Sequence, residues 1–190
     1  MATNPHMFLV GALPRSGSCW IATVLNLSSE GRCLHEGPAY YENPIQEIKG
    51  FNGQCSGDCG SHVMIEDYNR LPARRVFIHR NKEAVKRSTL AFFQRCNGEQ
   101  FYQDKLIDDL YEQALEWVRQ FQPLVIPYHE LFLIRSVERI WKHCMPELEF
   151  PKAKAEQLLS VNIQIKDFDM MAKRHKLLEV AQRLNMEARA

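Results

Sequence analysis

The sequence predicts an α/β fold in which a central, mainly parallel sheet of five strands is flanked by helices. Short apolar runs typical of buried strands alternate with longer helical segments, and this alternation favours parallel strands joined by helical crossovers. The chain has 190 residues, of which 45% are hydrophobic and 25% charged, as in an ordinary globular domain. We therefore expect residues 1–190 to form a single domain.

Five short segments are expected to form the strands of the sheet. Residues 7–11 form an apolar run of the kind that a buried central strand shows, and residues 13–17 make a turn after it. Apolar runs bounded by polar or turn-forming residues predict the other strands, which are Gly31–His35 (a weak one) and residues 62–66, 75–79 and 123–128.

Helices are expected between and after these strands. The predicted helices are residues 19–27, 82–93, 101–121 and 131–144, the third of which has apolar residues at helical spacing. Residues 43–61 are polar and glycine-rich, and we expect them to be part helix and part loop. From Lys152 onward we expect a helical tail with a break near Asn162.

Charge and hydropathy exclude some partners. The formal net charge is +1, so no global field recruits nucleic acid or an anionic membrane, and any anion site has to be local. No apolar run approaches the roughly 20 residues of a membrane span. The first residues lack the basic and apolar regions of a secretory signal, which predicts a cytoplasmic protein with reduced thiols.

Cys55, Cys59 and His62 form a crowded group of residue types that bind metals. A zinc site usually needs four ligands, and a fourth would have to come from elsewhere, such as Cys33 or Cys96. The alternatives are a disulfide between Cys55 and Cys59, or a glycine-rich loop with reduced thiols. We favour the last of these and expect no metal.

Residues 11–20, with the sequence GALPRSGSCW, lie between a predicted buried strand and a predicted helix, as a phosphate-binding loop does. Gly17 permits an unusual backbone angle and the close approach of phosphate oxygens. Ser16 and Ser18 add hydroxyl donors, and Arg15 supplies a fork of donors beside a transferred group. The alternative is an ordinary helix start that Ser16 or Ser18 caps.

This loop departs from the Walker A motif G-x4-G-K-[ST] at the residues that bind ATP and Mg²⁺. Ser18 stands where the motif has lysine, and Cys19 stands where it has the hydroxyl that binds the metal. A loop that keeps the cradle without the metal ligand suits a less highly charged donor than ATP. Its place after the first strand favours a P-loop-type three-layer fold.

A second anion-binding pattern combines Arg80, at the end of a predicted strand, with Ser88 on the following helix. Two helical turns and the connecting turn can return Ser88 toward Arg80, so that a guanidinium and a hydroxyl hold one phosphate. By itself, the pattern also fits an ordinary strand–helix corner with a surface arginine.

With both patterns in order, the chain resembles the sulfotransferases that use 3′-phosphoadenosine 5′-phosphosulfate (PAPS). In that family a P-[RK]-S-G-[ST]-[ST] loop holds the 5′-phosphosulfate, and an R-x7-S pair holds the 3′-phosphate. The first motif matches residues 14–18, with Cys19 in place of the usual hydroxyl, and the second matches Arg80 and Ser88. Residues 126–131 add a softer match to the family's late Y-E-D-L segment, which opens a helix.

The resemblance spans roughly residues 7–150 and implies an enzyme that transfers a sulfuryl group from PAPS, without a metal, to a hydroxyl or amine of a small-molecule or peptide acceptor. Two features depart from the family, because the chain is short for it and lacks the R-K-G loop of the cytosolic subfamily. The residues implied to bind PAPS are Arg15, Ser16, Gly17, Ser18, Cys19, Trp20, Arg80 and Ser88.

Sulfuryl transfer needs positive charge at the leaving phosphate oxygen and a base for the acceptor. Arg15 is expected to supply the charge. We favour Glu36 as the base because its stretch resembles the R-C-G-E-E stretch of tyrosylprotein sulfotransferases, and His35 is the competing base. Cytosolic sulfotransferases use a histidine shortly after the third strand. Glu66 and Asp67 occupy the predicted position here, so we do not expect that arrangement.

Two other functions fit parts of the pattern. A small P-loop kinase acting on a nucleotide or metabolite would need a Mg²⁺ ligand that the loop lacks. A non-catalytic relative would bind a nucleotide or a partner without turnover, which the short chain and Cys19 keep open. Mg²⁺-dependent ATP binding would favour the kinase, and metal-independent binding of the bisphosphate product PAP would favour the sulfotransferase.

Overall fold

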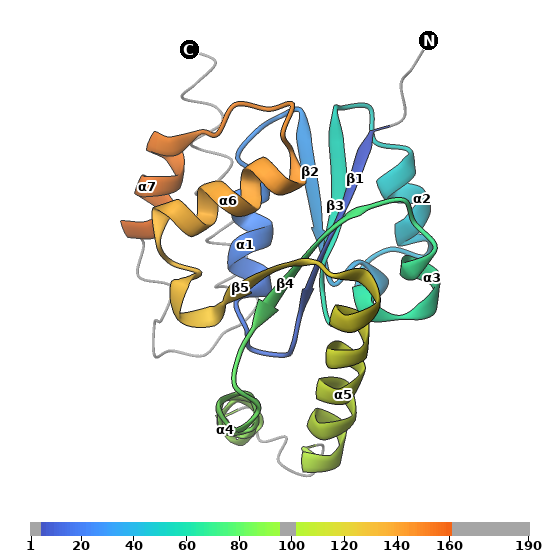
Figure 1. The fold of residues 1–190 in the computed structure, drawn as a ribbon, viewed down its shortest axis with the longest axis vertical. Coiled ribbons are helices and arrows are strands. Elements are labelled where there is room, and N and C mark those ends of the chain that lie inside the picture. The colour runs from blue at the N-terminus through green and yellow to red at the C-terminus, as the bar shows by residue number, and fades with distance from the viewer. Residues whose placement is uncertain (1–4, 96–101, 161–190) are drawn as a thin grey trace.

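The computed structural model describes residues 5–95 and 102–160, which surround a five-stranded sheet (Figure 1). All neighbouring strands are parallel, in the order β2-β3-β1-β4-β5. This confirms the expected α/β class and the parallel five-stranded sheet. The strands are β1 His6–Ala12, β2 Gly31–His35, β3 Cys55–Gly60, β4 Arg74–His79 and β5 Leu124–Pro127.

Helices cover both faces of the sheet and make three layers (Figure 1). One face is covered by α1 Ser18–Leu25, α6 Ile134–Cys144 and α7 Lys152–Ser160. The other face is covered by α2 Pro44–Lys49, α3 Glu66–Asn69 and α5 Asp104–Phe121. Helix α4, Lys82–Arg95, follows β4 and packs beside α5.

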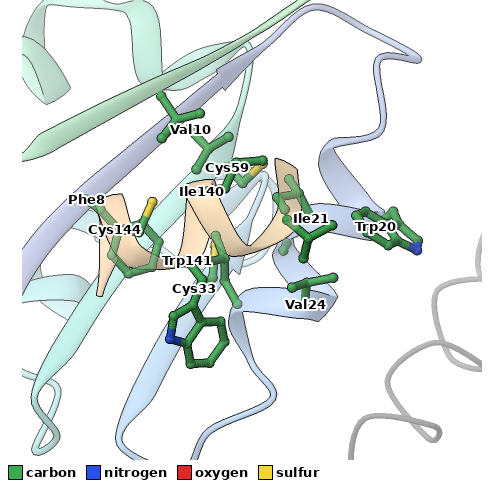
Figure 2. Close-up of a cluster of buried hydrophobic side chains, with 14 of the residues drawn as sticks. Phe8, Val10, Trp20, Ile21, Val24, Cys33, Cys59, Ile140, Trp141 and Cys144 are labelled. Carbon is green, nitrogen blue, oxygen red and sulfur yellow. The ribbon is translucent and has the colours of Figure 1, made fainter. Parts of the chain in front are cut away.

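Successive side chains of β1 point into two separate cores, as the alternation of a strand requires. Phe8 and Val10 pack with Trp141 and the other apolar residues of α1 and α6, and all three side chains are fully buried (Figure 2). Leu9 points to the opposite face, where it joins Trp117 of α5. This double-sided burial makes β1 the centre of the fold and fixes where its C-terminal end, and the loop after it, must lie.

The prediction of a third strand at residues 62–66 was wrong. These residues form the short 3₁₀ helix His62–Met64 and the start of α3, and the third strand is Cys55–Gly60. The stretch CSGDCG has the composition of a loop, since glycine, serine and aspartate have low strand propensity. It forms a strand because it fills the narrow space between β2 and β1, where all six of its residues are buried.

Gly57 shows why this strand needs small residues. A Cβ atom there would lie 2.2 Å from the carbonyl oxygen of Phe8 in β1. Gly57→Ala is therefore expected to lower the free energy of unfolding by about 1–3 kcal/mol, the usual cost of overpacking a core. Denaturant unfolding measures this, with Gly50→Ala at the end of α2, where φ is −83°, as the matched control. An equal effect of the two changes would contradict the packing argument.

The other predicted elements differ from the structure mainly at their ends. The helix predicted at residues 131–144 begins at Ile134, after a 3₁₀ turn, Tyr128–Glu130. Within residues 43–61 the helical part is α2, and the remainder includes β3. The tail is helical as far as Ser160, and the predicted break near Asn162 lies outside the described residues.

The thiols at the two ends of β3 do not form the disulfide considered above, because Cys55 and Cys59 are both free and buried. Burial raises the pKa of Cys55 to about 12, with further contributions from Glu147. Within residues 5–95 and 102–160, no three His, Cys, Asp or Glu side chains are grouped so that they could hold a metal ion.

Across these same residues, no helix has the length and apolar character needed to cross a membrane.

Candidate functional site

The loop between β1 and α1 has an unusual backbone. Arg15 and Gly17 both adopt left-handed conformations, with φ of 63° and 85°. Such turns direct successive N–H groups into a concavity that accepts an anion. Gly17 also has little space for a side chain, because a Cβ atom there would lie 2.5 Å from Leu131. Arg15 is strained in this conformation, as residues at ligand sites often are.

The start of α1 has no side-chain cap. Among the described residues no side chain caps the helix at Gly17, and its first turn carries no acidic residue to offset the positive end of the helix dipole. Ser16 is fully buried, and its hydroxyl has no hydrogen-bond partner among the described residues. A buried hydroxyl without a partner is costly, which suits a group that binds an anion. Cys19 is half-buried in the same turn.

Arg80, from the second predicted anion-binding pattern, contacts the loop of the first pattern. Its Nη1 donates a hydrogen bond to the main-chain carbonyl of Arg15, 65 positions away, and its guanidinium lies 4.2 Å from the centre of the Tyr128 ring. Arg80 forms no ion pair with any carboxylate in the described part of the chain. Because β1 and β4 are neighbouring parallel strands, their C-terminal ends bring these residues together.

Positive charge accumulates at this edge of the sheet. Burial lowers the pKa of the Arg15 guanidinium; Tyr128 opposes the shift, while the charges of Arg80 and Arg95 lower it further. Arg15 also lies 5.1 Å from the centre of the Phe92 ring on α4. The charges of Arg80 and Arg95 act on Arg15, so these side chains create a local positive field at this edge of the sheet.

The positions of Ser88 and Trp20, two of the predicted binding residues, give less direct support for binding. Ser88 is half-buried on α4 and forms no hydrogen bond to any described residue. Trp20 is buried in the core against Phe132, with ring centres 5.2 Å apart, and its indole N–H has no partner in the described part of the chain. Phe132 in turn contacts Tyr128, so an aromatic row runs from Trp20 to the ring under Arg80.

The two predicted base candidates diverge at the end of β2. His35 Nε2 lies 3.1 Å from Ser18 Oγ, so this ring faces the start of α1. Glu36 is exposed in a left-handed conformation with φ of 53°, and its carboxylate forms no hydrogen bond to a described residue. Its Cγ lies 3.5 Å from the place of a Cβ on Gly60, at the end of β3.

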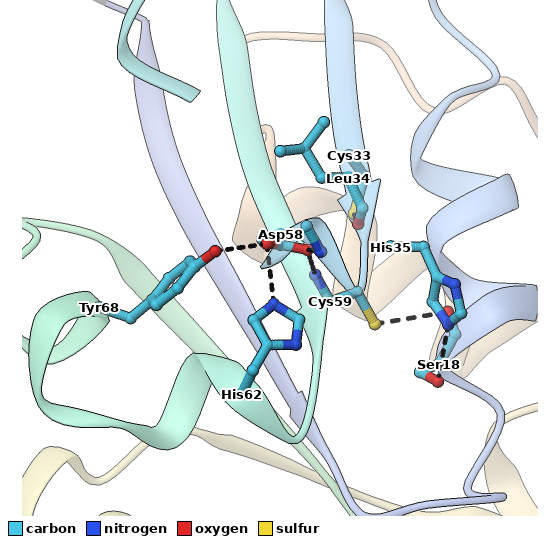
Figure 3. A network of polar contacts seen from close by, with 9 residues as sticks. Ser18, Cys33, Leu34, His35, Asp58, Cys59, His62 and Tyr68 are labelled. Atoms are coloured by element: carbon cyan, nitrogen blue, oxygen red, sulfur yellow. Dashed lines mark hydrogen bonds and ion pairs between the residues drawn. The ribbon is translucent and has the colours of Figure 1, made fainter. Parts of the chain in front are cut away.

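The sequence interpretation missed a polar network at the end of β3. Asp58 is fully buried, and one of its carboxylate oxygens lies 2.8 Å from His62 Nε2 and 2.8 Å from the Tyr68 hydroxyl (Figure 3). No local signal in the sequence marks this network, because the stretch CSGDCG has the composition of a loop and is a strand only through its neighbours. The misplaced third strand put His62 inside a predicted strand, where it was considered only as a metal ligand.

No protein-family model, curated protein or solved structure matches the chain, so its function has to be argued from the site itself.

Proposed function

We propose that this protein is a sulfotransferase that transfers a sulfuryl group from PAPS to a hydroxyl or amine of a small-molecule or peptide acceptor. The observation that carries the proposal is the convergence of Arg80 on the loop of Arg15. Two motifs that are far apart in the sequence, and that resemble the two PAPS-binding motifs, lie at one edge of the sheet. In open α/β sheets this edge is where ligands bind.

The first motif would hold the 5′-phosphosulfate. The uncapped N-terminus of α1 and the loop N–H groups suit its oxygens, with hydroxyl donors from Ser16 and Ser18. Arg15 would lie beside the phosphate oxygen that leaves, where a permanent positive charge stabilises the transition state. Cys19 and the N–H of Trp20 complete this proposed set. The residues that bind Mg²⁺ in a kinase loop are absent from the motif, so PAPS needs no metal here.

The second motif would hold the 3′-phosphate. The contacts with the Arg15 carbonyl and the Tyr128 ring fix the orientation of Arg80, and its five N–H donors leave several for a phosphate. Ser88 would add a hydroxyl from α4. This phosphate distinguishes PAPS and PAP from other adenine nucleotides.

His62 and Glu36 are the side chains that fit the base. Because β3 ends at Gly60, His62 lies shortly after the third strand, and as a base it would correspond to the histidine of cytosolic sulfotransferases. Its ring is held by Asp58, and its side chain is 15% exposed. Glu36 stands beside it as the second candidate. His35 is engaged with Ser18 and would act on the donor loop.

A thermal-shift comparison tests the donor. PAP is expected to raise the unfolding midpoint more than AMP, because only PAP carries the 3′-phosphate that Arg80 and Ser88 would bind. EDTA should make no difference to the PAP shift. Equal shifts with AMP and PAP would remove the basis for a PAPS site. A shift with ATP that requires Mg²⁺ would favour a kinase instead.

A further inference from the structure

Asp58 lies in the middle of the missed network and uses both of its oxygens. Oδ1 accepts hydrogen bonds from the main-chain N–H of Cys59 at 2.8 Å and of Gly37 at 3.4 Å. Oδ2 accepts from the Tyr68 hydroxyl and faces His62 Nε2, both at 2.8 Å (Figure 3). A carboxylate this deeply buried is stable only with such a full set of donors.

The protonation of His62 follows from this arrangement. An ionised carboxylate only accepts hydrogen bonds, so a neutral imidazole facing it must carry its proton on Nε2. Burial raises the pKa of Tyr68, and the charge of Asp58 adds to the effect, so the hydroxyl keeps its proton and donates it as well. The other ring nitrogen, Nδ1, is then the unprotonated one.

Nδ1 lies close against the main chain of Gly60, at the end of β3. A Cβ atom on Gly60 would lie 2.7 Å from Nδ1 of His62, and φ at Gly60 is 154°. The Cγ of Glu36 lies 3.5 Å from the same Cβ position. The ring of His62 also packs edge-on against Tyr68, with centres 5.2 Å apart, which limits its rotation.

We propose that Asp58 is a positioning residue, which fixes His62 with the proton on Nε2 so that Nδ1 accepts the proton of the sulfuryl acceptor. The inference rests on the proposed function and adds to it the route that the acceptor proton takes. Nδ1 takes the proton as the acceptor oxygen or nitrogen bonds to sulfur. The bond from sulfur to the phosphate oxygen breaks, and PAP leaves with the electron pair. The imidazolium that results is stabilised by the Asp58 carboxylate and later releases its proton to water.

Asp58→Asn is the discriminating change. The main-chain N–H groups of Cys59 and Gly37 can only donate, whereas the Tyr68 hydroxyl can rotate to accept. The amide oxygen therefore takes the place of Oδ1, and the NH₂ group faces His62 and Tyr68. The NH₂ group then donates to Nε2 and moves the ring proton to Nδ1. The same exchange in the Ser-His-Asp triad leaves the geometry intact but selects the wrong tautomer.

Long-range ¹H–¹⁵N NMR of the histidine rings reads this directly, without donor or acceptor. The His62 signals are assigned by their loss in a His62→Gln protein, and the spectra are recorded at a pH where the ring is neutral. We expect the Nε2–H form in the unmodified protein and in Tyr68→Phe, and the Nδ1–H form in Asp58→Asn. The Nδ1–H form in the unmodified protein would overturn the proposal, even if Asp58→Asn did not fold.

The same tautomer in a folded Asp58→Asn protein would also overturn it. A merely structural Asp58 would change stability without moving the ring proton. The thermal shift with PAP and this spectrum are independent measurements. An absent PAP shift would argue against the donor site, whereas an unexpected tautomer of His62 would argue against the role of Asp58. Once an acceptor is found, Asp58→Asn should lower turnover by roughly 10²–10⁴-fold and leave PAP affinity unchanged.

Discussion

Replacing His62 with Gln is expected to lower turnover by roughly 10²–10⁴-fold, the usual effect of losing a positioned base, while PAP affinity stays the same. The glutamine keeps a side-chain N–H that can donate to Asp58, so the buried carboxylate retains a partner. The ring contacts Asp58 and Tyr68 and is not one of the residues proposed to bind PAPS, which is why donor binding should not change. The measurement is release of PAP from PAPS with a panel of alcohols, phenols and amines as acceptors.

Glu36→Gln and His35→Ala in the same assay separate the candidates. Full activity in the His62→Gln protein, with a loss of the predicted size in Glu36→Gln, would make Glu36 the base, as the sequence suggested. A loss only in His35→Ala would assign that role to His35. Because His35 contacts Ser18, its replacement is expected to change PAP affinity instead.

Arg80→Ala is expected to weaken PAP binding by about 1.5–3 kcal/mol, the scale of a hydrogen bond to a charged group. AMP binding should weaken less, because AMP has no 3′-phosphate and loses only the support that Arg80 gives to the Arg15 loop. Isothermal titration with both nucleotides measures the difference.

Arg87→Ala is the matched control for Arg80, because Arg87 is exposed on α4 and its loss removes the same charge. It should leave both affinities unchanged. Ser88→Ala should weaken PAP alone, by about 0.5–1.5 kcal/mol, as for a single neutral hydrogen bond. If Arg80→Ala weakens PAP and AMP equally, Arg80 supports the loop and does not bind the 3′-phosphate.

The parallel sheet and the convergence of the two motifs were predictable because each depends on local sequence. The apolar runs of β1 and β4 identify these strands, and turn residues directly follow both of them. Once the strands are parallel neighbours, Arg15 and Arg80 have to emerge at the same edge. The placement of the residues proposed to bind the donor is therefore predictable from the motifs alone.

The acceptor side was not predictable in the same way. The identity of β3 depends on its neighbours, since Cys55–Gly60 has loop-like composition and is a strand only because β1 and β2 enclose it. Aspartate is a typical loop residue. Asp58 can be buried only because groups of residues 37, 59, 62 and 68 form hydrogen bonds with its carboxylate. Such a set of partners is a tertiary property.

Arg80 donates a hydrogen bond to the main-chain carbonyl of Arg15, so the side chain at position 15 takes no part in this contact. Position 15 is thus adjustable for protein engineering, since its side chain can be exchanged while the link between the two motifs persists. Glycine would adopt the positive φ there without strain, and lysine would keep a positive charge on a side chain of different length. A library at this single codon would vary the group that is proposed to lie beside the transferred sulfur without redesigning the loop that carries it.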